Sequence, residues 1–144
     1  MSAATSDINT NERYGDIVYL PIAASTIIYA GTLVSVNSSG QAISAADTAS
    51  TVVVGRAELH VDNSADGTGG ALSVPVKRGI FAYANAPSTN NLGAADVGQS
   101  IAYVYDNQTV GKAAGTTNSI KAGIVVDYDS VNNLVWIDTR RKSL

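Results

Sequence analysis

The residues best suited to acid–base chemistry stand close together, within residues 51–63. Arg56, Glu58, His60 and Asp62 occupy every second position there, and His60 is the only histidine in the chain. In an extended strand, residues two apart point to the same face and lie about 6.6 Å apart along the backbone. The four ionisable side chains therefore share a face, where they can form either a proton-transfer site or the hydrated side of a sheet.

Nothing else in the sequence completes a catalytic site around this row. A general base needs its partner within about 2.6–3.2 Å, and a second strand or loop has to supply that partner. The chain contains no cysteine, no G-x-S-x-G turn and no P-loop. We therefore interpret the row as a solvated or subunit-facing surface and expect no enzyme activity. A small hydrolase that uses His60 is kept as an alternative.

We also expect no cofactor and no metal site. A lone histidine does not make a histidine-rich metal site. The loop DNSADGTGG at residues 62–70 carries carboxylate and amide oxygens, but their order does not match an EF-hand. Turn formation accounts for the Asp and Asn residues of this loop.

The composition limits the partners that the chain can recognise. Charged residues make up 15% of the chain, against about 25% of a typical globular domain. The formal net charge is -3 and no basic tract is present, so we expect no nucleic-acid partner. The apolar runs are far shorter than the ~20 residues of a membrane-spanning helix, so we expect no membrane partner.

The pattern of apolar residues predicts an all-β protein with little helix. No segment keeps a helical period over the ~10 residues that a helix needs, whereas short β-branched runs alternate with turn residues. We expect a small β-barrel or β-sandwich-like domain over residues 16–139, with an extended, flexible N-terminal arm at 1–15 and a polar C-terminal tail at 140–144. The expected strands and hairpins cover residues 16–22, 25–37, 32–44, 51–61, 71–84, 99–113 and 119–139.

The sequence also predicts where two prolines, the tryptophan and one strand face lie in this fold. Pro21 and Pro75 have no N–H to donate to a sheet ladder, which favours positions on edge strands. Trp136 and the apolar side of residues 52–61 are expected to be largely buried, because large apolar side chains usually lie in the core.

Five longer stretches follow one another in a specific order. They are IYAGTLVSVNSSGQAI (28–43), AADTASTVVVGRAELHVDN (45–63), GALSVPVKRGIFAYANA (70–86), ADVGQSIAYVYDNQTV (95–110) and SIKAGIVVDYDSVNNLVWID (119–138). As an ordered set, these stretches resemble the capsid cement, or head decoration, proteins of tailed bacteriophages. The resemblance covers roughly residues 16–138, and the arm offers no specific match.

The resemblance implies a virion protein that binds the outer surface of the phage capsid. Its partner would be the major capsid protein, its own assembly a homotrimer, and its role the stabilisation of the phage head, without catalysis or cofactor. Three copies bind a symmetric site far more tightly than one. The expected capsid or subunit contacts are Asp7, Asn9, Asn11, Arg13 and Tyr14 in the arm and Arg56, Glu58 and His60 in the alternating row.

A carbohydrate- or host-surface-binding β module displayed on the particle is the second interpretation. Tyr83, Tyr103, Tyr105 and Trp136 can supply aromatic platforms for sugar rings, and the Asp/Asn loops can hold an ion. The two interpretations differ in whether aromatic side chains are exposed together on one face.

Overall fold

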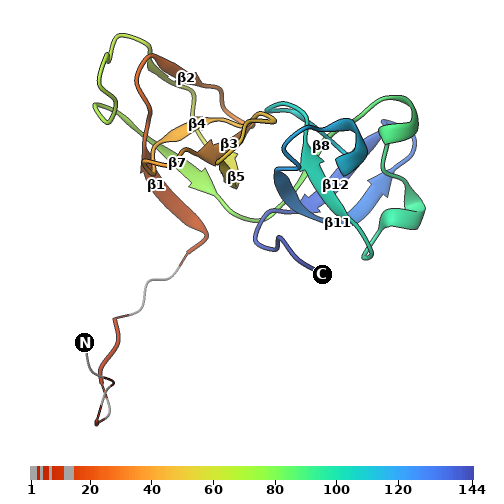
Figure 1. Ribbon diagram of the computed structural model, residues 1–144, viewed down its shortest axis with the longest axis horizontal. Coiled ribbons are helices and arrows are strands. Elements are labelled where there is room, and N and C mark those ends of the chain that lie inside the picture. The colour runs from red at the N-terminus through yellow and green to blue at the C-terminus, as the bar shows by residue number, and fades with distance from the viewer. Residues whose placement is uncertain (1–2, 4, 7, 12–14) are drawn as a thin grey trace.

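The computed structural model describes residues 3, 5–6, 8–11 and 15–144, and it confirms the predicted all-β class. Strands account for 42% of the chain and helix for 7%. Figure 1 shows two β bodies side by side, which we call the sheet body (residues 17–77) and the barrel (residues 80–138). The described arm residues 8–11 lie away from both bodies.

The sheet body contains a five-stranded sheet and a two-stranded ribbon. The sheet has the order β1-β7-β5-β3-β4, and β2 and β6 form the ribbon. The strands are β1 (Ile17–Pro21), β2 (Thr26–Ile28), β3 (Leu33–Val36), β4 (Ala42–Ser44), β5 (Val52–Ala57), β6 (Val61–Asn63) and β7 (Ser73–Lys77). The predicted hairpin at 32–44 is confirmed by the antiparallel pairing of β3 with β4.

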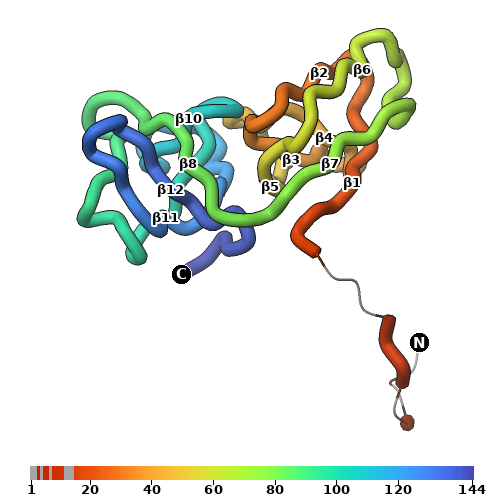
Figure 2. The backbone as a smooth tube through the Cα atoms, turned by 180° about the vertical axis from the view of Figure 1, so that it is seen from behind, coloured from red at the N-terminus to blue at the C-terminus, as the bar shows by residue number. Residues whose placement is uncertain are grey.

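The barrel is a closed sheet with the order β10-β8-β12-β11-β9. Its strands are β8 (Ile80–Asn85), β9 (Ile101–Val104), β10 (Thr109–Gly111), β11 (Lys121–Asp129) and β12 (Leu134–Asp138). The predicted hairpins β9–β10 and β11–β12 are both present. Short 3₁₀ turns at Ser88–Asn90, Ala94–Asp96 and Ala113–Gly115 complete the connections. Figure 2 shows the barrel and the sheet body from behind.

The two bodies share a hydrophobic core through strand β3. Val34 packs with the cluster inside the sheet body, whereas the adjacent Leu33 packs with the barrel cluster. Successive side chains of a strand point to opposite faces, so β3 is buried on both sides. Val53 from β5 also joins the barrel cluster, in which Phe81 and Tyr83 are the large side chains. This shared core fixes the position of β5, and therefore of the residues that β5 presents.

The prediction of one long strand over residues 51–61 is wrong. β5 ends at Ala57, and the chain then leaves the sheet to pair elsewhere as β6. The N–H of Glu58 still donates to the carbonyl of Pro75 at 2.9 Å. Proline has no N–H to donate in return, so the ladder between β5 and β7 stops after the pair Ala57–Val76. Pro75, which lies on a strand distant in the sequence, therefore ends the alternating row of Arg56, Glu58, His60 and Asp62 after Glu58.

Pro75 also lies differently from the sequence prediction, whereas Pro21 lies as expected. Pro21 ends β1, which is an edge strand. Pro75 lies in β7, which pairs with β1 on one side and with β5 on the other, so it is not on an edge. The sheet tolerates this proline because its missing N–H faces the place where β5 leaves the ladder.

Trp136 contradicts the expectation of burial, because its side chain is 39% exposed. Its neighbours Val135 and Ile137 are fully buried in the barrel, so the period of two along β12 turns Trp136 outward. On the adjacent strands, Ala82 and Asp127 lie directly opposite it. A methyl group and a carboxylate do not cover an indole ring, which therefore remains accessible.

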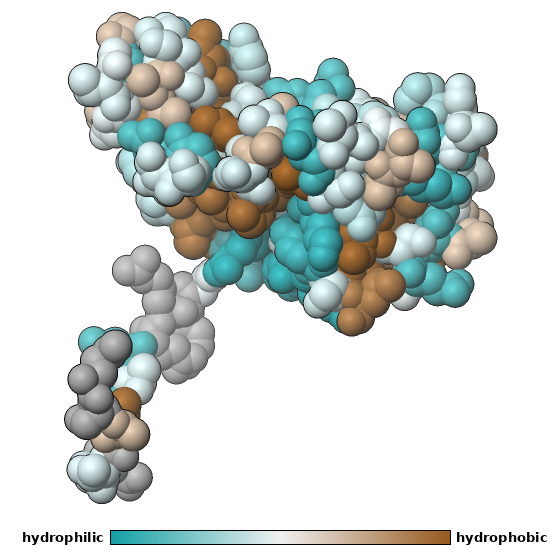
Figure 3. Space-filling view, in the orientation of Figure 1, coloured by the Kyte–Doolittle hydropathy of each residue, from teal (hydrophilic) through white to brown (hydrophobic). Residues whose placement is uncertain are grey.

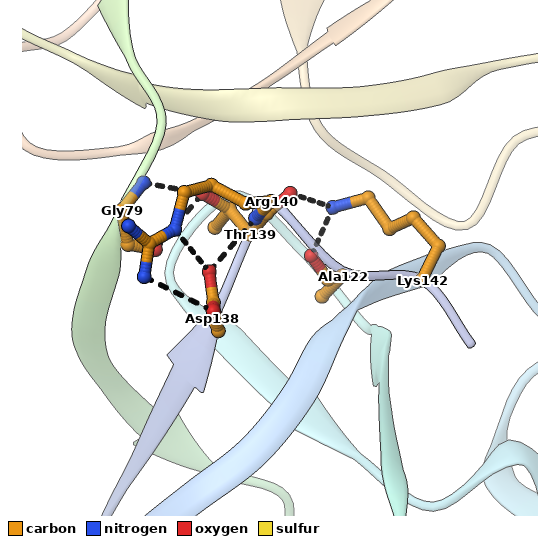
Figure 4. Close-up of polar contacts among 6 residues, drawn as sticks. All are labelled: Gly79, Ala122, Asp138, Thr139, Arg140 and Lys142. Atoms are coloured by element: carbon orange, nitrogen blue, oxygen red, sulfur yellow. Dashed lines mark hydrogen bonds and ion pairs between the residues drawn. The ribbon is translucent and has the colours of Figure 1, made fainter. Parts of the chain in front are cut away.

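The C-terminal tail lies beside the barrel, on the side near the sheet body (Figure 1), and Figure 4 shows its polar contacts. The Lys142 amine donates to the carbonyl oxygens of Ala122 (2.5 Å) and Thr139 (2.6 Å). Thr139 in turn exchanges hydrogen bonds with Gly79, which leads into β8. The polar C-terminal tail is thus hydrogen-bonded to β11 through Lys142.

We predict that raising the pH above 8 stabilises the fold through Lys142. Burial lowers the pKa of Lys142 to about 8 from its ordinary 10.5, so the unfolded chain binds more protons between these values. The free energy of unfolding should therefore rise by about 1–1.5 kcal/mol between pH 8 and ~9.5. Below about pH 7, Lys142 is protonated in both states, so the free energy of unfolding is lower there and no longer changes through this group. Urea unfolding across this range checks the slope, and the variant Lys142→Met should lack it. An identical slope in both proteins contradicts the prediction.

Candidate functional site

The predicted site residues Arg56 and Glu58 lie on the outer face of the sheet body, in two rows across the strands. Arg56 pairs with Lys77, which pairs with Ile17. Glu58 bonds to Pro75, which pairs with Tyr19. Directly opposite residues in a sheet share a face, with Cβ atoms about 4.5–5.5 Å apart. We call this set of six residues the β1 face: Ile17, Tyr19, Arg56, Glu58, Pro75 and Lys77.

Arg56 and Glu58 form a structural ion pair at the inner end of this face. The Arg56 Nη2 atom lies 2.7 Å from Glu58 Oε1, and the guanidinium lies 4.3 Å from the centre of the Phe81 ring. Phe81 belongs to the barrel, so this cation–π contact joins the two bodies. Burial raises the pKa of the nearby Tyr83 hydroxyl, which donates to the carbonyl of Gly31 at 3.3 Å. The pair is fixed by packing and has no free carboxylate aimed at a substrate.

His60 does not belong to a catalytic arrangement in the described part of the chain. Its ring meets the Tyr29 ring edge-on, with centroids 5.1 Å apart and an interplanar angle of 79°. No hydrogen bond or ion pair joins it to a hydroxyl or carboxylate among residues 15–144. Hydrogen bonds from Ser64 lower the pKa of the neighbouring Asp62 carboxyl. The structure brings Arg56 and Glu58 together but leaves His60 beside an aromatic ring, outside the β1 face.

The exposed part of the β1 face is the edge strand β1 itself. Ile17 is 44% exposed and Tyr19 is 74% exposed. Figure 3 shows apolar residues gathered on the sheet body around β1, where the arm joins the sheet body. Edge strands usually carry a charge, a proline, a bulge or a covering element that blocks pairing with other chains. The sequence IVYLP of β1 carries no charged residue, and its proline stands at the last position, so the edge from Ile17 to Leu20 is open.

The backbone of β1 adds unpaired hydrogen-bonding groups to this edge. Asp16 accepts a bond from Arg78 (2.8 Å), and Ile22 donates to Leu72 (2.9 Å), so even-numbered residues face β7. In an antiparallel pair the intervening residues direct their N–H and C=O groups the other way. Ile17 and Tyr19 therefore present both groups to the open edge. Ile22 bridges to Ala42 and closes the edge beyond Pro21.

The arm contributes less to the described surface. Asn9 and Asn11 are exposed, as is Ile8 at 73%. The predicted contact residues Asp7, Arg13 and Tyr14 lie outside the described residues.

The loops with several carboxylates are occupied by turn formation. Asp66 accepts hydrogen bonds from Ala71, Thr68 and Asn63, which hold its pKa well below the usual range. Asp129 accepts bonds from Val131 and Asn132 in the same way. Within the described ranges, no group of three or more His, Cys, Asp or Glu side chains is arranged to hold a metal ion.

Sequence reasoning missed Ile17, Tyr19 and Lys77 as members of the site. One signal was present: residues 17–21 alternate like a half-buried strand but carry apolar side chains on both faces. The partnership of β1 with β7 joins residues more than fifty positions apart, and no local pattern indicates it.

Three comparisons with known proteins were made on this chain. It matches no protein-family model, no curated protein and no solved structure. No helix in the described part is long and apolar enough to cross a membrane.

Proposed function

We propose that the chain is a structural protein of a tailed-phage virion that binds the outside of the major capsid protein shell as an oligomer and stabilises the head. The ordered motifs over residues 16–138 support this proposal through their resemblance to cement proteins. The observation that carries it is the open edge of strand β1 before Pro21, with Ile17 and Tyr19 exposed at the base of the arm. A surface of this kind on a chain that forms its own core points to a protein partner.

The chemistry of the β1 face fits a protein contact better than a reaction site. Its apolar and aromatic residues lie at the outer end, and the ion pair of Arg56 and Glu58 lies at the inner end beside the barrel. Interfaces of this composition concentrate binding energy in a few aromatic side chains surrounded by polar groups. Tyr19 is the aromatic residue of the β1 face.

The proposal is tested by mixing the purified full chain with undecorated, expanded phage capsids and measuring the occupancy after sedimentation. We expect saturable binding at a fixed ratio to the major capsid protein. Analytical ultracentrifugation of the free chain should show the trimer that the resemblance implies. Absence of stoichiometric binding at micromolar protein would refute the proposal.

Trp136 supports carbohydrate binding as a second candidate function. Its indole is exposed between Ala82 and Asp127, which provides an open aromatic surface beside a carboxylate that can accept sugar hydroxyls. Of the other predicted platforms, Tyr83 is 5% exposed and the Tyr105 hydroxyl is bonded to the carbonyl of Lys112. Tyr103 and Tyr105 are half-buried, so Trp136 is the most exposed of the four predicted platforms.

We expect this candidate, if correct, to give saturable glycan binding that the variant Trp136→Ala weakens. Stacking of a ring on an aromatic side chain contributes about 0.5–1.5 kcal/mol, or roughly a threefold to tenfold change in affinity per subsite. A glycan array probed with and without a chelator makes the measurement. Equal and flat signals from both proteins would exclude the carbohydrate function.

A further inference from the structure

A pocket opens where the sheet body, the barrel and the C-terminal tail meet. Its volume is about 230 Å³, and it is lined by Thr51, Val52, Ser119, Ile120, Lys121 and Lys142. Its surface is mainly apolar, and two lysines and two residues with hydroxyl groups are among its lining residues. An enclosed apolar cavity of about 150 Å³ is large enough to bind benzene, so this pocket has room for an aliphatic group of similar or greater size.

The loops that form the pocket walls are held together by one carboxylate. Asp47 accepts hydrogen bonds from the backbone N–H groups of Thr117 (2.5 Å) and Asn118 (2.8 Å), and its own carbonyl accepts from the Asn118 amide (2.8 Å). Asp47 leads into β5, whereas Asn118 leads into β11. The two walls are therefore fixed relative to each other before any ligand enters.

The backbone around the pocket is irregular on both sides. Ser50 and Ser119 have positive φ angles of 61° and 52°, which cost residues other than glycine about 1–3 kcal/mol. A register shift on β11 lies between Gly123 and Lys121, and Lys121 lines the same pocket. Strained residues and bulges concentrate at sites that bind ligands. Three such features lie at or beside this pocket.

The charge at the pocket is positive and lacks a close counter-ion. The Lys142 amine bonds only to the carbonyls of Ala122 and Thr139, and no ion pair among the described residues includes Lys121 or Lys142. Burial lowers the pKa of Lys142 to about 8, and the charge of Asp138 offsets only part of that effect. A carboxylate bound here would supply the missing negative charge.

We propose that this pocket binds an apolar group that carries a carboxylate. The aliphatic part would lie against Val52 and Ile120, and the carboxylate would lie between Lys121 and Lys142, with a hydroxyl donor from Ser119. Two sources share this chemistry: a small aliphatic acid and the C-terminal residue of a peptide. Binding of this ligand would not require attachment of the chain to a capsid shell.

The first test is an NMR titration of the full chain with hexanoate and, separately, with hexan-1-ol. We expect saturable amide shifts confined to residues 50–52, 119–122 and 142. The neutral alcohol should bind about threefold to fivefold more weakly, which is the effect of one partly exposed ion pair. Equal affinities for the two probes, or no saturable shifts with hexanoate, would overturn the proposal.

Three variants locate the binding in the pocket. Val52→Trp fills the pocket and should abolish saturable binding, since Val52 is 59% exposed and can be enlarged without disturbing the core. Lys121→Gln should remove most of the difference between hexanoate and the alcohol. The exposed Lys112, which does not line the pocket, gives the control Lys112→Gln with unchanged binding. Unchanged hexanoate binding in Val52→Trp contradicts the assignment.

The two sources are separated with short N-acetylated peptides that end in leucine. Tighter binding of the free-carboxylate peptide than of hexanoate, lost in the C-terminal amide, identifies a peptide terminus as the ligand. Tighter binding of hexanoate identifies a small acid. Each result supports the proposed chemistry and assigns its source.

Discussion

The variant Gly55→Ala is expected to lose about 3–5 kcal/mol of folding free energy, a large part of the roughly 5–15 kcal/mol that a domain possesses. A Cβ atom at Gly55 would overlap the backbone carbonyl of Lys77, whose carbon would lie 2.8 Å away. That carbonyl belongs to the neighbouring strand β7, which is held by β1 on its other side. The overlap cannot be relieved by rotating a side chain.

Gly67 provides a matched control for this substitution. A Cβ atom there meets no other atom within 4 Å, and the residue does not have a positive φ. Gly67→Ala should change the stability by less than about 1 kcal/mol, with a small gain if the unfolded chain loses entropy. Thermal unfolding followed by circular dichroism should place Gly55→Ala roughly 10 °C or more below the wild type. Equal midpoints for the two variants would show that the strands separate more easily than the structure indicates.

Local signals in the sequence predicted the class of the fold and most of its hairpins. The hairpins β3–β4, β9–β10 and β11–β12 join adjacent segments through turn residues, and their pairing depends on neighbours in the sequence. The division into a sheet body and a closed barrel was not predicted. It depends on pairings such as β1 with β7 and β8 with β12, which connect distant segments and leave no local pattern.

The errors have the same physical origin. The strand expected at residues 51–61 ends early because Pro75, on another strand, cannot return a hydrogen bond to Glu58. Trp136 is exposed because its opposite neighbours, Ala82 and Asp127, are too small or too polar to cover it. The early end of β5 and the exposure of Trp136 both depend on which strands are neighbours in the sheet, and a single sequence does not indicate the strand order.

The candidate site was predicted in part. The contact between Arg56 and Glu58 follows from their spacing of two residues along β5 and its continuation. The contact of His60 with Tyr29 could not be foreseen, because it needs the ribbon of β2 and β6. The sequence predicts that the exposed apolar residues of β1 lie in a strand. Only the strand order of the sheet shows that this strand is at an edge.

Tyr19→Lys is expected to reduce attachment to capsid shells by at least about 30-fold, the effect of losing a contact worth ~2 kcal/mol. The expectation depends on the proposed function. Tyr19 is 74% exposed, so its replacement should change the folding free energy by less than ~0.5 kcal/mol. A lysine on an exposed edge is also the device by which natural sheets prevent pairing with another chain. Occupancy on expanded capsids, titrated from low to saturating protein, gives the measurement.

Val131→Lys is the matched control for this effect. Val131 is 90% exposed at the turn between β11 and β12, so the same change of charge and polarity is made on the barrel, away from β1. It should bind capsids as the wild type does. Equal occupancy of Tyr19→Lys and Val131→Lys would remove the β1 face from the attachment surface.

A pair of substitutions at Ile17 separates side-chain docking from pairing of the backbone with a strand of the shell protein. Ile17→Ala removes the exposed apolar group, and Ile17→Pro also removes an N–H that faces the open edge without breaking a bond to β7. Proline is tolerated at the first residue of a strand. If a shell strand pairs with β1, the proline variant should bind several-fold more weakly than the alanine variant, since a hydrogen bond contributes about 0.5–1.5 kcal/mol. Equal binding of the two variants, below that of the wild type, would instead assign the contact to the side chains of the β1 face.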